Sequence, residues 1–275
     1  MAMIDKLWLA TRTKDKKDAD TGGTRLNLTV DVDGEDILDF DFTFMRASGG
    51  NLGPDSSWLG RAQAAISDSS PLATQIDTTL LTNSSIRLGI RTDDAWGPED
   101  VLLLGNTDRE VIALAMETEV GPFLSTDHKE GKLTMPLRLV SPGSSTTLIQ
   151  RVMFLCYTGS VGGTDKPVQI QITAGGNLVL TQQIVDTKQD DFEEYTGNWY
   201  FLNPPVPFTR GDVISSGGIT LTVLGTDAWT PKMIFFFGLD TASGRPNEVV
   251  RLVSVTDWTL GSLSSQVPPV SLPLF

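Results

Sequence analysis

The residues of this sequence best suited to chemistry are carboxylates, and one group of them has the composition of a calcium site. The group consists of Asp93, Asp94, Glu99 and Asp100. Calcium binds about six to eight oxygen ligands, several of them from carboxylates. The corresponding part of the second half of the chain keeps Asp227 but has Thr226 and Lys232 nearby. The sequence therefore predicts that calcium, the one cofactor it suggests, binds in the first half.

A second group of carboxylates precedes the aromatic segment at 199–201. It consists of Asp186, Asp190, Asp191, Glu193 and Glu194. The first interpretation is a solvated acidic loop that leads into an apolar strand. A metal site and a patch for a basic partner are the alternatives.

Catalytic chemistry finds little support in the sequence. The chain has one histidine, His128, and one cysteine, Cys156, and His128 falls where the second half has Trp258. None of the patterns GxSxG, GxxxxGK[ST], GxGxxG after a strand or HExxH is present. Two carboxylates could hydrolyse a glycoside, but the sequence sets no separation between any pair. We therefore predict that the protein is not an enzyme.

The negative net charge of the chain argues against some classes of binding partner. Its 275 residues include 21 Lys+Arg and 34 Asp+Glu, which gives a net charge of -13 and a pI near 4.4. Binding to nucleic acid or to anionic lipid needs a basic surface, so we predict no nucleic-acid partner.

One cysteine excludes a disulfide framework. With no signal-like N-terminus and no apolar run long enough for a transmembrane segment, we expect a cytoplasmic protein or one released without a classical signal peptide.

The chain contains an internal repeat. Residues 84–105, SSIRLGIRTDDAWGPEDVLLLG, align without a gap with residues 217–238, GGITLTVLGTDAWTPKMIFFFG. Asp94–Trp96 aligns with Asp227–Trp229, and apolar positions match in phase on both sides. Weaker similarities flank this block in the same order in both halves. They predict two homologous domains, 1–140 and 146–275, joined by the Pro/Gly/Ser-rich segment 141–145.

Hydrophobic periodicity predicts β-structure in both halves. Residues 26–32 and 168–172 alternate apolar and polar side chains, as half-buried strands do. The runs at 101–104 and 233–237 are continuously apolar, which is typical of strands covered on both faces. Strands recur between Gly, Pro, Asn and Asp residues. The fold class is therefore all-β, with two tandem antiparallel β-sandwich domains.

Two segments depart from this pattern. Residues 57–67, SWLGRAQAAIS, have Leu59, Ala62 and Ile66 at helical spacing, which predicts a short helix in an insertion around 45–82 of the first domain. The C-terminal tail, 266–275, is apolar and contains three prolines, so it is extended. It either packs on its own domain or docks onto another subunit.

The Asp-Ala-Trp segments, each followed by an apolar strand, resemble the PLAT (lipoxygenase-homology) family. Its Gly-rich turn is matched well by Thr158–Asp165 and more loosely by Asp18–Thr24. The resemblance implies a β-sandwich in each half and a role in binding lipid or protein, in some members with calcium held by loop carboxylates. PLAT domains are usually appended to an enzyme. Here two copies use up the chain, so the resemblance implies the binding role alone.

The matched Asp and Trp residues are the candidate binding residues. Trp96 and Trp229 either plug their sandwiches or contact a partner, because a large aromatic side chain can do both. Asp94 and Asp227 either cap their turns or bind a ligand.

Three functions fit these observations. The first is a non-catalytic binding protein that contacts lipid, protein or glycan. The second is a structural subunit of a filament, shell or phage-tail-like assembly, since sandwiches expose edge strands. The third is a cell-surface-binding toxin component. A protein partner or self-assembly is expected before lipid or glycan.

Overall fold

The computed structural model describes residues 3–15, 25–43, 57–61, 72, 74–91, 95–108, 110–121, 123–127, 131–185, 192–241 and 246–274. The chain divides into two compact units, Met1–Val140 and Ser141–Phe275. The described elements are almost all β-strands, as the periodicity predicted.

The first unit contains thirteen strands and one 3-10 helix among its described residues. They are β1 (Met3–Ile4), β2 (Lys6–Thr13), β3 (Arg25–Val32), β4 (Glu35–Thr43), β5 (Ser57–Arg61), β6 (Ile76–Asp77), η1 (Thr78–Leu80), β7 (Ile86–Ile90), β8 (Ala95–Trp96), β9 (Pro98–Asn106), β10 (Val111–Glu117), β11 (Phe123–Ser125), β12 (Gly131–Lys132) and β13 (Thr134–Pro136). The main sheets have the orders β10-β9-β2-β5 and β13-β7-β3-β4, with smaller sheets β1-β6 and β12-β11-β8.

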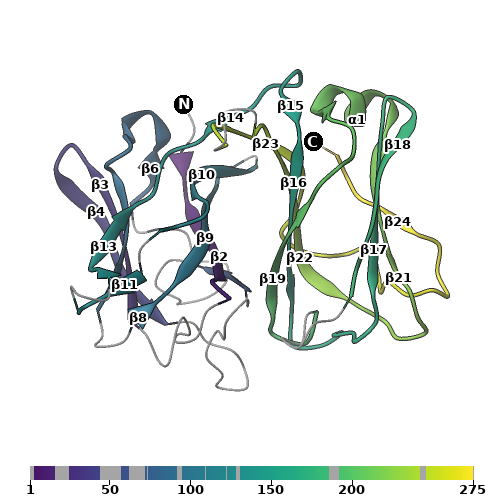
Figure 1. The fold of residues 1–275 in the computed structure, drawn as a ribbon, viewed down its shortest axis with the longest axis horizontal. Helices are drawn as coiled ribbons and strands as arrows, with labels where there is room; N and C mark the ends of the chain where they lie inside the picture. Colours follow the sequence, from purple (N-terminus) through teal and green to yellow (C-terminus); the bar gives the residue numbers. More distant parts are fainter. Residues whose placement is uncertain are drawn as a thin grey trace. The chain divides into compact units, whose positions relative to one another are not determined.

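The second unit is built in a similar way. Its described elements are β14 (Ser141–Pro142), β15 (Leu148–Ile149), β16 (Arg151–Thr158), β17 (Val168–Ala174), β18 (Asn177–Ile184), β19 (Gly197–Leu202), β20 (Phe208–Thr209), α1 (Arg210–Ser216), β21 (Gly218–Val223), β22 (Pro231–Leu239), β23 (Glu248–Val255) and β24 (Val270–Ser271). The sheets have the orders β14-β23-β22-β16-β19, β18-β17-β21-β24 and β15-β20. In Figure 1 the two large sheets of this unit stand face to face.

The two units share one strand order. The order β10-β9-β2-β5 corresponds to β23-β22-β16-β19, β13-β7-β3-β4 corresponds to β24-β21-β17-β18, and β1-β6 corresponds to β15-β20. Equivalent strands also follow one another in the same sequence along the chain. The sequence repeat around the Asp-Ala-Trp segments therefore extends to the topology of each unit.

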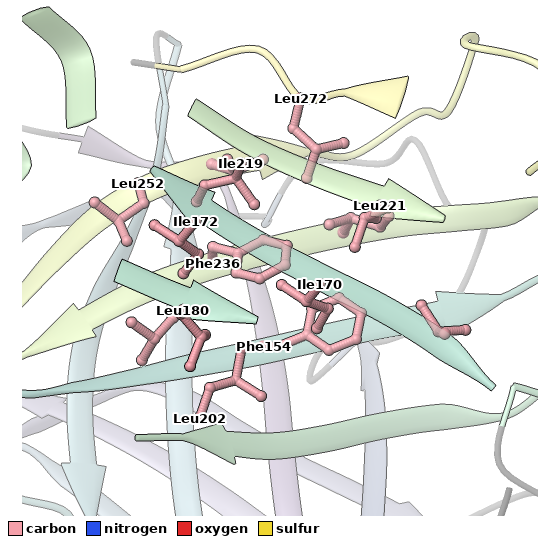
Figure 2. Close-up of a cluster of buried hydrophobic side chains, with 14 of the residues drawn as sticks. Phe154, Ile170, Ile172, Leu180, Leu202, Ile219, Leu221, Phe236, Leu252 and Leu272 are labelled. Atoms are coloured by element: carbon pink, nitrogen blue, oxygen red, sulfur yellow. The ribbon is translucent and has the colours of Figure 1, made fainter. Parts of the chain in front are cut away.

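Alternating side chains build each core. In β17, Val168, Ile170 and Ile172 are fully buried, whereas Gln169 and Gln171 between them are half-buried on the other face. Figure 2 shows Ile170 and Ile172 within the cluster to which Phe154 and Phe236 of the opposite sheet belong. The first unit has an equivalent cluster that joins β3 and β7 to β2 and β9.

The continuous apolar runs are buried on both faces. Val101 and Leu103 belong to the core of the first unit, while Leu102 and Leu104 point the other way and are also fully buried. In β22, Ile234 and Phe236 belong to the core, and the intervening phenylalanines, Phe235 and Phe237, are buried as well. The prediction from these runs is confirmed.

The helix predicted at 57–67 is wrong over its first five residues. Ser57–Arg61 is a strand, β5, which pairs antiparallel with β2 and places Leu59 opposite Ala10. In this position Leu59 is buried in the unit, and the backbone of β5 completes the sheet edge. The rest of the predicted helix lies outside the described residues. The region 45–82 is also not purely an insertion, because its strands β5 and β6 match β19 and β20 of the second unit.

The one described α-helix is in the second unit. Thr209 caps α1, its side chain accepting a hydrogen bond from the Asp212 backbone N–H, while the Asp212 side chain accepts one from the Thr209 backbone. This reciprocal arrangement is a capping box, which satisfies backbone groups at the start of a helix. This helix was not predicted from the sequence, although Thr-x-x-Asp at 209–212 is a capping-box pattern that could have marked its start.

The predicted linker and the C-terminal tail are both integrated into the second unit. Ser141 and Pro142 form β14, which pairs parallel with β23, so this part of 141–145 is not a free connection. Val270 and Ser271 form β24 on β21, and Leu272 is buried in the core, as Figure 2 shows. Of the two interpretations of the tail, packing on its own domain holds for its described residues.

A glycine at equivalent positions makes room for an isoleucine in each unit. A Cβ added to Gly238 would lie 2.5 Å from Cδ1 of Ile149, and one added to Gly105 would lie 2.6 Å from Cδ1 of Ile4. We expect Gly238→Ala to lower the free energy of unfolding by about 1–3 kcal/mol, because the core is overpacked.

Chemical denaturation measures this effect. Adding Ile149→Val should recover part of the loss in Gly238→Ala, since it removes a methyl group from the crowded site. Gly159→Ala is the control, because its Cβ would meet only ordinary contacts at 3.7 Å. Equal stability of Gly238→Ala and the wild type would contradict the prediction.

Candidate functional site

The two repeated tryptophans are structural plugs. Trp96 and Trp229 both have 0% of their surface exposed. The indole Nε1 of Trp96 donates to Oγ1 of Thr13 at 3.1 Å, and that of Trp229 donates to Oγ1 of Thr158 at 2.9 Å. A buried N–H needs such an acceptor, so each hydrogen bond stabilises the ring in the core. The surface of any binding site must therefore come from residues around them.

A β-bulge positions each threonine. In the first unit the pairing of β2 with β9 shifts between Arg12 and Thr13. In the second the pairing of β16 with β22 shifts in the same way between Tyr157 and Thr158. A bulge bends its strand and redirects a side chain, and both threonines are fully buried. The Trp–Thr hydrogen bond is therefore part of the shared architecture.

Asp227 has a local role and an exposed position. Its Oδ1 accepts a hydrogen bond from the backbone N–H of Ala228 at 2.9 Å, as expected of a turn residue. Nearby, Nζ of Lys166 lies 2.8 Å from a carboxylate oxygen of Asp165. The hydrogen bond with Lys166 and its positive charge lower the pKa of Asp165. The same hydrogen bond and the negative charge of Asp165 raise the pKa of Lys166. Asp94, the counterpart of Asp227, lies outside the described residues.

Two of the predicted calcium ligands are bound to an arginine. Asp100 is buried and lies 3.0 Å from one guanidinium nitrogen of Arg12, and Glu99 lies 3.0 Å from the other. Asp100 also accepts a hydrogen bond from the backbone N–H of Glu119. A calcium ion at these carboxylates would compete with Arg12 for their oxygens.

The remaining calcium candidates, Asp93 and Asp94, lie outside the described residues. Within the described segments, no group of three or more His, Cys, Asp or Glu side chains is arranged to hold a metal ion. Calcium stays a prediction that rests on Asp93 and Asp94. It is testable because an ion that binds only the native state raises the melting temperature.

The other candidates from the sequence are dispersed. Of the second carboxylate group, Asp186, Asp190 and Asp191 lie outside the described residues, as does His128. Glu193 and Glu194 lie in the loop before β19. Cys156 is fully buried in the core of the second unit.

The sequence did not reveal a cluster of loops around Trp229, which we call the loop end of the second unit. It consists of residues 159–166, 192–196, 225–230 and 257–263. Backbone hydrogen bonds connect these loops: Tyr195 N–H to Gly159 O, Thr230 N–H to Gly162 O, Thr164 N–H to Phe192 O and Trp229 N–H to Leu263 O. The loops therefore form one hydrogen-bonded surface rather than separate turns.

The loop end exposes apolar and aromatic side chains. Val161 is 69% exposed, Leu260 44% and Tyr195 41%. Phe192 and Tyr195 both have positive φ, 62° and 61°, which is unfavourable for residues with a side chain. This backbone places Phe192 edge-on against Trp229, with ring centroids 5.0 Å apart, and leaves Tyr195 in solvent.

No protein-family model matches the chain, and no curated protein matches it significantly. Among the described residues, no helix is long and apolar enough to span a membrane.

Removing the threonine hydroxyl tests how much the Trp–Thr hydrogen bond contributes to the free energy of unfolding. We expect Thr158→Val to lower the free energy of unfolding by about 1–3 kcal/mol, because the indole N–H of Trp229 loses its acceptor while buried. Urea denaturation measures the change.

A double-mutant cycle with Trp229→Phe separates this effect from lost packing. Once the indole N–H is gone, Thr158→Val should cost less than in the wild type. Thr181→Val, at an exposed site, is the control and should change stability by less than about 0.5 kcal/mol. Additive effects of Thr158→Val and Trp229→Phe would disprove the coupling.

Arg12 should stabilise the first unit through Asp100. We expect Arg12→Met to cost on the order of 3 kcal/mol, because it leaves a carboxylate buried without its cation. Arg91→Met is the matched control: its ion pair with Asp39 is exposed, so its loss should cost about 0–1 kcal/mol. The same denaturation assay compares them, and equal losses would show that Asp100 does not need Arg12.

Proposed function

We propose that this chain is a non-catalytic binding protein, built from two PLAT-like β-sandwiches, that contacts a protein partner through the loop end of the second unit. The observation that carries the proposal is the exposure of Val161, Tyr195 and Leu260 on loops that hydrogen bonds hold together. Tyrosine is enriched at protein interfaces, where its ring supplies contact area and its hydroxyl a polar contact.

Preorganisation favours this surface over other exposed apolar residues. Ordering loops on binding lowers affinity, so a surface whose loops are already connected retains more of its contact energy. The positive φ values at Phe192 and Tyr195 point the same way, since unfavourable backbone conformations concentrate at ligand-binding and active sites. Phe192, packed on Trp229, fixes the loop that presents Tyr195.

The charge of the loop end favours one kind of partner. Asp165, Glu194, Asp227 and Asp257 are exposed there, whereas the basic residues are Lys166 in the same loops and Lys232 in the adjoining strand β22. With the net charge of -13, this excess disfavours an anionic membrane. It suits a protein with an apolar pocket and a basic rim, because complementary charge speeds encounter and selects partners.

The non-catalytic part of the proposal rests on where reactive groups lie. Cys156 is buried in the core, and Glu99 and Asp100 are engaged by Arg12. The PLAT-like interpretation is supported by the antiparallel sandwich in each unit and by the repeated Asp-Ala-Trp segment before an apolar strand.

Site-specific photo-crosslinking tests the proposal. A photoreactive phenylalanine in place of Tyr195 should crosslink to one recurrent protein in cells that produce the chain. The same group in place of Val206 is the control, because Val206 is 60% exposed but follows the opposite end of β19. Val161→Asp should reduce the crosslink at 195 several-fold by placing a charge at the apolar contact.

Equal crosslinking at 195 and 206 would refute the assignment of the surface, and an absence of protein crosslinks at 195 would refute the protein partner. Parallel flotation with neutral and anionic vesicles, and binding to a glycan array, report the lipid and glycan alternatives.

A structural subunit of a larger assembly is the second candidate function. The observation that favours it is β18, a strand of eight residues at the edge of a sheet, without charge or proline. Such edges are templates for strands of other chains.

A further inference from the structure

The edge strand β18 has one neighbouring strand, β17, in the part of the chain that the structure describes. Its sequence is Asn-Leu-Val-Leu-Thr-Gln-Gln-Ile, so it carries neither the charge nor the proline that commonly protects sheet edges. The equivalent edge strand of the first unit, β4, contains Glu35, Asp36, Asp39 and Asp41. Of these two equivalent edges, only β4 carries charged residues.

The sheet face beside β18 is also uncharged. In cross-strand register, Gln183, Gln169 and Thr222 form one row, and Thr181, Gln171 and Thr220 form the next. The equivalent face of the first unit has ion pairs instead, Arg87 with Asp31 and Arg91 with Asp39. In a chain of net charge -13, two copies can approach one another at β18 without placing carboxylates in contact.

Gln182 is the residue of this edge that suggests how a second strand would pair with it. It lies opposite Ile170, which belongs to the core. Residues two positions apart in a strand share a face, so Gln182 is on the same core-facing side as the buried Leu180 and Ile184. The side chain is half-buried there. An amide carries both donors and an acceptor, so it can pair with an identical amide across a two-fold axis.

We propose that a second copy of this chain pairs with β18 antiparallel, across a two-fold axis at Gln182, and continues the sheet from one copy into the other. This register places Leu180 opposite Ile184 of the second copy on the core side, and Thr181 opposite its Gln183 on the outer side. Residues that share a face stay on that face, as a continuous sheet requires. The two-fold axis makes the contact isologous, because the same residues of both copies meet.

The pairing does not depend on the binding function proposed above. The loop end and β18 use different residues, so either proposal can fail alone.

Sedimentation velocity over a concentration series tests the proposal. The wild-type chain should shift from monomer to dimer as concentration rises. Gln182→Glu should raise the dissociation constant at least about tenfold, because two carboxylates would then face each other across the axis. Gln171→Glu is the matched control: it makes the same chemical change on a central strand of the same sheet and should retain the dimer.

The pH dependence of Gln182→Glu gives a second readout. A like charge raises the pKa of a carboxyl group, so the paired glutamates should take up a proton at mildly acidic pH. The dimer of this variant should therefore return as the pH falls, while the wild-type dimer changes less.

Gln182→Cys tests the register itself. The only native cysteine, Cys156, is buried, so a disulfide on a non-reducing gel would join the two new cysteines. Directly opposed Cβ atoms lie about 4.5–5.5 Å apart in an antiparallel pair, close to the separation a disulfide needs. Val206→Cys is the control and should not crosslink.

A wild-type chain that stays monomeric at the highest soluble concentration would overturn the proposal, and so would a dimer that Gln182→Glu does not weaken.

Discussion

The interaction on which both units depend is the hydrogen bond from the indole N–H of a fully buried tryptophan to a threonine hydroxyl. An unpaired donor in an apolar interior costs about 1–3 kcal/mol, a large part of the stability of a domain. In each unit a threonine at a β-bulge provides the acceptor, Thr13 for Trp96 and Thr158 for Trp229. The bulge, the threonine and the tryptophan therefore cannot change independently, which is why the same geometry recurs at both positions.

The two units keep a common interior and differ on the surface. Gly105 with Ile4 and Gly238 with Ile149 repeat the same close packing, and the strand order is the same. On the surface, by contrast, the first unit has acidic residues and ion pairs where the second has threonine and glutamine. Packing tolerates few changes, whereas surface positions can diverge with little effect on stability. Distinct roles for the two units are therefore expected at the surface.

The two proposed contact surfaces use different interactions, side-chain contacts at the loop end and backbone hydrogen bonds at β18. The loop end presents side chains whose backbone is already held in place by hydrogen bonds, so its specificity comes from shape and charge. The β18 edge presents backbone donors and acceptors, so its specificity depends on register and on the residues that face one another. A charge at the edge affects only the second surface, and a change at Tyr195 affects only the first.

The sequence by itself determined the β-structure, the repeat and the importance of the tryptophans, because alternation and aromatic bulk are local properties of a chain. It could not assign Ser57–Arg61, whose hydrophobic spacing suits a helix but whose backbone pairs with β2, a strand far away in sequence. Nor could it show that Glu99 and Asp100 face Arg12, or that hydrogen bonds join the loop of Tyr195 to the loop of Val161. Such neighbours are brought together only by long-range strand pairing, and proximity in space, not in sequence, decides what a carboxylate or a tyrosine can bind.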